Sequence, residues 1–411
     1  MKKGIFVVGF VVSILMLLFS QVMAQGDRIR FNNLKLIPGI TLQEIYDDNI
    51  YLGCGSNNTS EAEESDLITH FMPALGLDYS LHERGNVSFY YTGDFAYYSD
   101  NDKNDWQTHK GEFNFNYWAP RGIILDINTI HIDAEDPYGN LELYRIGLKT
   151  ERQNSDIKAK IAYGFGNRFK ILAYYNYYKQ DYDLERDYTQ DWDVNEFGAG
   201  FQMRLLPKTW GFFRYYFGER DYFTHPAGTG VTESNDSDFD WNRVNIGLTW
   251  ERGPKLEGEL NFGYQLMDYK NTVDVEGDRY DSKDTWIAAT SITYTATPTI
   301  GLALSLTRGL RETGSSDNEY FEDTGIGVNM KKMIKSKFIL NAGGVYSAND
   351  YNLPVTRPRE DESYKISIGL DYLIQDWLTA GVGYTYEKKD SNYGINDYTD
   401  TRFIISLSGA Y

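Results

Sequence analysis

The chain has 411 residues and is acidic, with 59 Asp and Glu against 40 Lys and Arg and a formal net charge of −19. This charge excludes nucleic acid as an expected partner, because the phosphate backbone repels an acidic protein. Aromatic residues make up 16% of the chain, with 34 Tyr, yet the mean hydropathy is −0.50. This combination is unusual for a soluble globular protein and is typical of membrane β-barrels, which carry Tyr in aromatic girdles.

The first 24 residues have the pattern of a secretory signal peptide. Met1-Lys2-Lys3 is basic, residues 5–19 form an apolar stretch, and Val22-Met23-Ala24 precedes the expected cleavage ahead of Gln25. The apolar stretch is shorter than the roughly 20 residues that a spanning helix needs. Loss of Lys2 and Lys3 would change the net charge to −19 − 2 = −21. No later run is long and apolar enough for a spanning helix, which excludes a helical membrane protein.

The rest of the chain alternates between tight turns and longer acidic loops, separated by segments in which apolar and polar residues alternate. Leu260, Phe262 and Tyr264, for example, share one face of such a segment, and Glu259 and Asn261 share the other. A period of two predicts β-strands, and the helical period of 3.6 is absent. These strands are long for a soluble sandwich and suit tilted membrane strands.

We predict 18 strands in a single domain, residues 25–411. They lie at residues 37–47, 67–80, 86–98, 106–118, 122–133, 152–165, 168–181, 191–205, 209–222, 239–252, 255–269, 284–296, 299–312, 319–332, 336–350, 362–373, 376–388 and 400–411. Sixteen strands are the alternative, because 134–152 is hard to assign. The predicted fold is an all-β, transmembrane, antiparallel up-and-down barrel with short periplasmic turns and long extracellular loops.

An interior of this kind would be lined by the charged residues of the inward face. Three arginines on consecutive strands are predicted to form a basic ladder opposite two glutamates, although pairing that only braces the wall is an equal alternative. The predicted lumen-lining residues are Arg204, Arg214, Arg243, Glu196, Glu257, Glu259, Asp371 and Arg402. Inward Tyr side chains could stack on sugar rings or pack within the wall.

Acidic corners raise the question of metal binding. The run Asp47-Asp48-Asn49 is interpreted as a strand-ending turn rather than as a metal- or partner-binding corner. The loop set Asp236, Asp238 and Asp240 resembles part of a calcium loop, but it lacks the Gly and Glu that such loops need. No metal site is therefore predicted, and weak divalent bridging to lipopolysaccharide is expected at most.

The sequence shows no pattern of catalytic residues. The five His do not converge with Ser or Asp in a recognisable constellation, and no Cys/His metal cluster, phosphate-binding Gly loop or nucleophile elbow is present. We therefore predict no enzymatic activity, no catalytic residues and no cofactor.

The last residues form an alternating strand that ends on an aromatic residue. Phe403, Ile405, Leu407 and Tyr411 share one face of this strand. This pattern resembles the sorting signal that the outer-membrane barrel assembly machinery reads, which makes that machinery and the outer-membrane lipids expected partners.

Two stretches near the start of the mature chain carry a family resemblance. They are residues 38–52, with Asp47-Asp48-Asn49 at their centre, and residues 65–75. The chain resembles the putative beta-barrel porin 2 family of Gram-negative outer-membrane proteins. The resemblance implies an outer-membrane barrel without catalytic residues. Members often occur beside exopolysaccharide synthesis and export systems, so it also implies a polysaccharide conduit that works with periplasmic export proteins.

Three functions remain open from the sequence. The first is a conduit for exopolysaccharide or another large polar solute, and the second is a diffusion porin for small solutes. A porin would need a constricting inward loop, for which the loops after residues 133 and 223 are candidates. The third is a closed structural or adhesion barrel that binds through its acidic extracellular loops.

Overall fold

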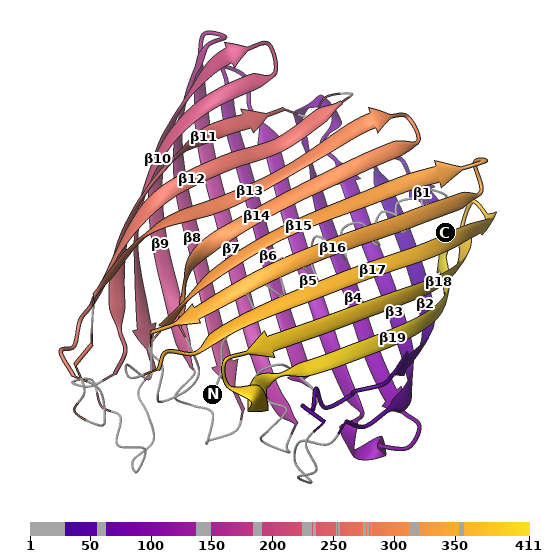
Figure 1. The fold of residues 1–411 in the computed structure, drawn as a ribbon. Coiled ribbons are helices and arrows are strands. Elements are labelled where there is room, and N and C mark those ends of the chain that lie inside the picture. The colour runs from indigo at the N-terminus through magenta and orange to yellow at the C-terminus, as the bar shows by residue number, and fades with distance from the viewer. Residues whose placement is uncertain are drawn as a thin grey trace.

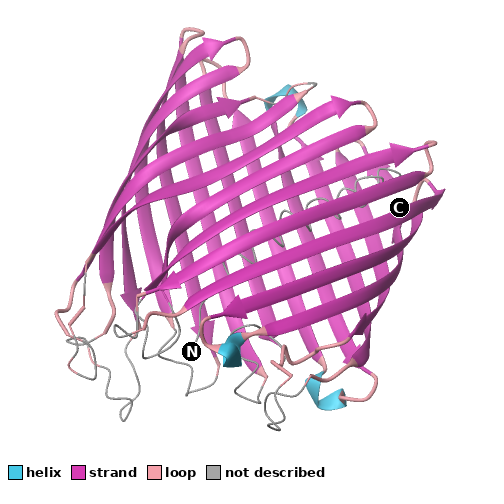
Figure 2. Ribbon diagram, viewed as in Figure 1, coloured by secondary structure: helices cyan, strands magenta, loops and turns pink. Residues whose placement is uncertain are grey.

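The computed structural model describes residues 29–55, 63–136, 149–183, 191–223, 236–251, 255–273, 282–312, 320–352 and 357–411, together with 232, 253, 277 and 279–280. They form one antiparallel sheet of 19 strands, and three of the connections between strands contain a short 3₁₀ turn (Figures 1 and 2). The described residues form no helix that is long and apolar enough to cross a membrane. The predicted signal peptide lies outside the described residues.

The strands and their bounds follow the chain in order. They are β1 (Ile29–Phe31), β2 (Leu34–Asp47), β3 (Asp66–Ser80), β4 (Gly85–Tyr98), β5 (Trp106–Trp118), β6 (Ile123–Asp136), β7 (Thr150–Phe165), β8 (Phe169–Tyr182), β9 (Trp192–Leu206), β10 (Thr209–Tyr222), β11 (Phe239–Trp250), β12 (Leu256–Tyr269), β13 (Lys283–Thr297), β14 (Ile300–Glu312), β15 (Tyr320–Ile334), β16 (Phe338–Tyr351), β17 (Glu360–Gln375), β18 (Leu378–Ser391) and β19 (Tyr398–Ala410).

The prediction of an 18-stranded barrel is confirmed, with β1 as one short addition. Each predicted strand corresponds to one of β2 to β19, with ends that agree within three residues. The 16-strand alternative is wrong, because β6 and β7 pair from Ile123↔Tyr163 to Asp136↔Thr150 without a break. The strands are long because each must cross the apolar layer of a bilayer at a tilt.

The two ends of the barrel differ in their connections. At one end, drawn towards the top of Figure 1, the strands are joined by turns of two to five residues, such as 207–208 and 376–377. At the other end the connections have six or more residues. We call these the short-turn end and the long-loop end. Register shifts in the ladder occur beside three of the two-residue turns, between β9 and β10, β13 and β14, and β17 and β18.

The barrel closes where the first long strand meets the last. β19 pairs with β2 from Arg402↔Asp47 to Ala410↔Gly39, so that opposite ends of the chain lie side by side at the lower right of Figure 1. β19 does not reach the first residues of β2. The short strand β1 pairs with β2 there, from Ile29↔Leu36 to Phe31↔Leu34, and covers the edge that β19 leaves open.

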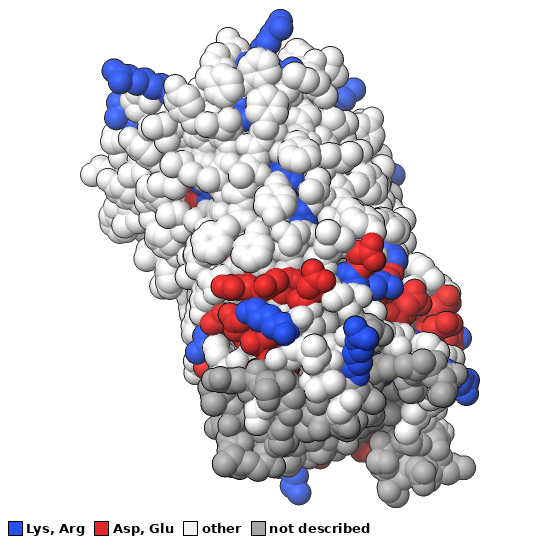
Figure 3. All heavy atoms as spheres, turned by 90° about the vertical axis from the view of Figure 1, so that its left-hand side faces the viewer, with Lys and Arg blue, Asp and Glu red and all other residues white. Residues whose placement is uncertain are grey.

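Alternation separates an outward apolar face from an inward polar face. The predicted assembly residues Phe403, Ile405, Leu407 and Tyr411 all lie exposed on the outward face, with Ile405 at 65%. Figure 3 shows one side of this surface, where a broad area of mostly uncharged side chains adjoins a group of acidic and basic side chains near the long-loop end. Such a belt is the surface that a membrane barrel presents to lipid.

The neighbouring pair Ile404 and Ile405 tests this assignment of faces. Ile405→Lys puts a charge in the lipid and is expected to reduce the free energy of unfolding by about 2–4 kcal/mol. Ile404→Lys, on the inward face of β19, is expected to cost less than about 1 kcal/mol. Equilibrium unfolding of the refolded protein in lipid vesicles measures both, and equal costs would contradict the assignment.

Candidate functional site

The inner face of β5, β6 and β7 is accessible to solvent. Lys158 and Lys160 alternate on β7 with Ile161, which is exposed on the outward face. Lys160 pairs with Asp126 of β6 at 2.6 Å, yet its side chain remains 39% exposed, and that of Lys158 remains 54% exposed. Ammonium groups inside a closed barrel can be exposed to this extent only if the interior holds solvent. This stretch, which we call the wet wall, therefore borders an aqueous lumen.

The inner face of β8 to β12 is packed instead. Arg214 of β10 donates two hydrogen bonds to Glu259 of β12, at 2.8 and 2.7 Å. Arg243 of β11 donates to Glu196 of β9 at 2.6 Å. Each pair crosses over the strand between its members, which requires a concave wall. The bidentate pairing of Arg214 with Glu259 fixes that guanidinium in one orientation.

The cations of the same wall stack on aromatic rings. The shortest cation-to-ring distances are those of Arg214 over Phe212 at 3.8 Å, Lys170 over Trp210 at 3.9 Å, Arg220 over Trp192 at 4.0 Å, Arg204 over Trp210 at 4.6 Å and Arg243 over Tyr216 at 4.7 Å. We call this set of stacked cations and their acidic partners the arginine column. Stacking on a ring is worth most where water is excluded, so the column stabilises the packed wall.

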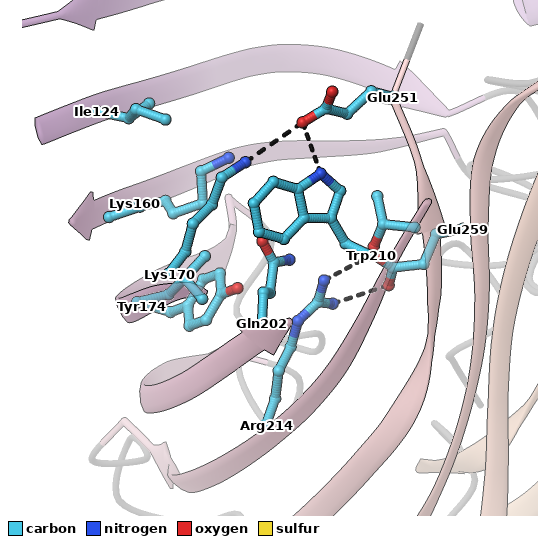
Figure 4. A pocket seen from close by; sticks show the side chains of 12 residues that line it. Ile124, Lys160, Lys170, Tyr174, Gln202, Trp210, Arg214, Glu251 and Glu259 are labelled. Carbon is cyan, nitrogen blue, oxygen red and sulfur yellow. Dashed lines mark hydrogen bonds and ion pairs between the residues drawn. The ribbon is translucent and has the colours of Figure 1, made fainter. Parts of the chain in front are cut away.

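A pocket of about 300 Å³ opens between this wall and the inner face of β6 and β7, towards the short-turn end. Figure 4 shows its lining: the indole of Trp210 donates to Glu251 at 2.7 Å, and Lys170 reaches the same carboxylate at 3.4 Å. Tyr174 and Arg214 lie beside them. The volume is at the lower limit of small-ligand pockets, about 300–1,000 Å³. Its mixture of rings, cations and carboxylates suits a hydroxyl-rich solute better than an apolar one.

The predicted lumen residues lie on the inner face but pair differently from the predicted ladder. Arg214 faces Glu259 as predicted, whereas Arg243 pairs with Glu196. The others are placed as follows: Arg204 stacks on Trp210, Glu257 shares the inner face of β12 with Glu259, Asp371 accepts from Asn341 at 2.8 Å, and Arg402 lies at the seam between β2 and β19. The sequence analysis missed Lys170, Trp192, Trp210 and Arg220, although alternation puts all four on the inner face.

The described ends of the hairpin β14–β15, residues 309–312 and 320–323, which we call its tip, fold inwards at the long-loop end. On β15, Val328 is 52% exposed on the outward face, but Tyr320 on the same face is only 8% exposed. Tyr320 joins one buried cluster with Trp241 and Met267, which lie on the inward face of β11 and β12. The pairing of β13 with β14 stops at Ala288↔Arg308, which lets the tip turn inwards. The loops that the sequence suggested as constrictions lie largely outside the described residues.

An acidic cluster surrounds the loop before β11. Asp236 Oδ1 accepts from Asn271 Nδ2 at 2.6 Å, and Asp238 Oδ1 accepts from the backbone N–H of Tyr222 at 2.7 Å. Burial raises the pKa of Asp238 to about 7, and the charges of Asp236 and Asp221 add to this, whereas Lys270 opposes it. Within the described part of the chain, Asp236, Asp238 and Asp240 do not bring three carboxylate oxygens together.

A second acidic group does converge, at the closing seam. Oxygen atoms of Asp47 and Asp48, at the end of β2, and Asp400, at the start of β19, all lie within 4.8 Å of one another. Asn49, the residue after Asp48, is buried. Its side-chain amide forms hydrogen bonds with the backbone of Gly53 and donates to the carbonyl of Thr399 across the seam. The predicted strand-ending turn is thus present and is also joined to the last strand.

The sequence matches the model of a known family over all of the described residues. The model described as putative beta-barrel porin 2 matches residues 29–411. A comparison with curated proteins returns no match.

Several solved structures are similar to this barrel. The FrpB iron transporter of Neisseria meningitidis (F3-3 variant) has a TM-score of 0.44 and 10% identity, and the match covers 90% of this chain and 63% of FrpB. The outer membrane protein OpdK of Pseudomonas aeruginosa has a TM-score of 0.46 and 9% identity, and the match covers 92% of this chain and 99% of OpdK. OccAB4 of Acinetobacter baumannii has a TM-score of 0.46 and 10% identity, and the match covers 92% of this chain and 98% of OccAB4. TM-scores below 0.5 are too low for a functional comparison.

Removal of Glu196 tests whether the arginine column braces the wall. Glu196 accepts from Arg243, from the Trp241 indole at 3.1 Å and from Asn176 at 2.8 Å. Glu196→Ala leaves the partly buried guanidinium of Arg243 without its carboxylate and is expected to cost about 3 kcal/mol of unfolding free energy. Asp156→Ala, which removes a pair on the wet wall, should cost about 0–1 kcal/mol. Denaturant titrations of the two variants measure the loss of unfolding free energy. Similar losses would show that the arginine column stabilises the protein no more than the ion pairs of the wet wall do.

Asp238 makes stability depend on pH. Its pKa is about 7 in the folded chain against 3.8 in the unfolded chain, so the folded state binds the proton more tightly. Stability from this group is therefore present at low pH and is lost as the pH rises from about 4 to about 7. Asp238→Asn should flatten this dependence and raise the unfolding midpoint at high pH. The exposed control Asp102→Asn should leave the pH profile unchanged.

Proposed function

Because the chain belongs to the putative beta-barrel porin 2 family, we propose that it is an outer-membrane channel for a large polar solute, namely an exopolysaccharide on its way out of the cell. The observation that supports this most directly is the wet wall, where Lys158 and Lys160 remain exposed inside a closed barrel. An aqueous interior is what the passage of a polar chain requires.

The inner surface suits a hydroxyl-rich polymer. Tyr90, Tyr174, Tyr178 and Tyr216 lie at inward positions, where the sequence left open whether they stack on sugar rings or pack within the wall, and the pocket beside Trp210 adds charged groups next to aromatic rings. Aromatic rings and charged hydrogen-bonding groups contact sugars without demanding one orientation, since each sugar residue offers both an apolar face and hydroxyls. A polymer could then move from one contact to the next.

The orientation and partners are part of the same proposal. The short-turn end would face the periplasm and the long-loop end the outside, after export by the signal peptide over residues 1–24 and insertion by the barrel assembly machinery. Periplasmic polysaccharide export proteins would then meet the short-turn end. The acidic long-loop end would lie among the lipopolysaccharide head groups.

A small-solute porin is the second candidate, and one observation favours it. The tip of β14–β15 folds inwards against Trp241 and Met267, which narrows the mouth as a constricting loop narrows a diffusion porin. A narrow mouth would pass small solutes but would have to move aside for a polymer.

Single-channel conductance of the refolded protein in a planar bilayer tests the proposal. We expect a steady conductance that alginate, a polymer of uronic acids, or the neutral polymer dextran reduces reversibly. Lys158→Glu on the wet wall should shift the ion selectivity towards cations, because it reverses a charge beside the ion path. The control Lys388→Glu, at an exposed position on the rim, should leave selectivity unchanged.

The remaining outcomes separate the candidates. Steady conductance that neither polymer affects would support the diffusion porin. Absence of conductance would overturn both channel functions and would support the third candidate, a closed barrel that binds through its acidic loops.

A further inference from the structure

We propose that a divalent cation, best matched by calcium, binds at the closing seam of the barrel between Asp47, Asp48 and Asp400. The seam joins β2 to β19 at the lower right of Figure 1, and the three residues lie at its long-loop end. Their carboxylate oxygens lie within 4.8 Å of one another. The proposal does not depend on what passes through the barrel.

The hydrogen bonds around these carboxylates leave one buried oxygen without a partner. Asp47 accepts from the backbone N–H of Asn49 and from Arg402 Nε, at 2.8 and 2.9 Å. Asp48 Oδ1 accepts from the backbone N–H of Thr401 at 2.6 Å. Asp400 Oδ2 pairs with Arg402 at 2.5 Å, but Asp400 Oδ1 has no hydrogen-bond partner although the residue is only 2% exposed. An unpaired, buried carboxylate oxygen is costly and calls for a cation.

Asp66, at the same rim, shows how the chain satisfies a buried carboxylate without a cation. It lies opposite Asp47 in the register of β2 and β3. Its two oxygens accept from the backbone N–H groups of Leu67, Ser99, Asp100 and Asn101 and from the Asn101 side chain. Asp400 has no such set of donors. The contrast indicates that the position of Asp400 is built for a ligand that the protein itself does not supply.

The charges at the seam point to a divalent ion. When all three are ionised, Asp47, Asp48 and Asp400 carry three negative charges, and Arg402 carries one positive charge that pairs with two of them. The nearby Glu387 is neutralised by Lys365 at 2.8 Å and accepts from Tyr398. The remaining charge is therefore −3 + 1 = −2, which one divalent cation balances.

The ligand set selects calcium among the divalent cations. All three candidate groups are carboxylates, which are the ligands of hard cations rather than of zinc or copper. Calcium accepts six to eight oxygens in irregular arrangements, whereas magnesium requires a nearly ideal octahedron and keeps most of its waters. Asp48 is partly exposed at the rim, so water can complete the coordination sphere there. A cation in this position would hold the end of β2 to the start of β19.

Calcium titration of the refolded full-length protein in detergent, after treatment with EDTA, tests the proposal by isothermal calorimetry. We expect one site per chain with a Kd of about 10⁻⁴ M, near the values of extracellular calcium modules. Asp400→Asn and Asp48→Asn should each weaken binding by about tenfold or more. The matched control Asp390→Asn, an exposed rim residue paired with Lys388, should bind as the wild type does.

Thermal unfolding provides a second readout that a purely structural aspartate would not move. In EDTA, Asp400→Asn should unfold at a higher temperature than the wild type, because the amide removes uncompensated buried charge. In calcium the order should reverse, because only the wild type gains from binding.

The proposal is overturned by any of three results. These are the absence of saturable binding to the wild type, unchanged binding in both site variants, or an order of unfolding temperatures that calcium does not reverse. If Asp400→Asn does not fold, Asp48→Asn carries both measurements, because its side chain is less buried.

Discussion

Closure of the sheet is the constraint on which the rest of this structure depends. A bilayer offers no water to the backbone, so every N–H and C=O within it must be paired inside the protein, and a sheet can meet this demand only by leaving no edge. Here the last strand must return to the first long one, and β1 covers the few residues of β2 that β19 does not reach. An inside and an outside exist only once this seam has formed. The alternation along each strand then becomes a lipid face and a lumen face.

Within the closed barrel the inner surface is used in two ways. From β8 to β12, side chains two strands apart meet, and each cation there is held by a carboxylate or a ring. Along β5 to β7 the charges remain in water and their pairs are weak. Removing two charges from water costs several kcal/mol per ion in general, which is why the packed wall needs both acids and rings for its arginines. The inner surface of the barrel is therefore closely packed along β8 to β12 and accessible to solvent along β5 to β7.

The sequence predicts the fold well and the site only in part, for a physical reason. Which residues of a strand share a face can be read from the local alternation of apolar and polar residues. The register shifts occur at the short-turn end, beside turns such as 207–208, so they do not exchange the inward and outward faces along the rest of each strand. Contacts between strands that are not neighbours depend on how the wall curves, which alternation does not encode. For this reason Arg243 meets Glu196 rather than the predicted Glu257 and Glu259. The inward turn of β14–β15 and the approach of Asp400 to Asp47 are long-range in the same sense.

The seam has a consequence for the order in which the molecule can be made. Arg402 and its partner Asp47 are 355 positions apart, so one edge of β2 has no partner until almost the whole chain has been synthesised and exported. Earlier hairpins can form locally, but the entropy of joining such distant ends opposes closure until the final strand arrives. The growing sheet must therefore be shielded from other chains while it waits. A truncation of only the last dozen residues would leave nearly all of the barrel present and none of it closed.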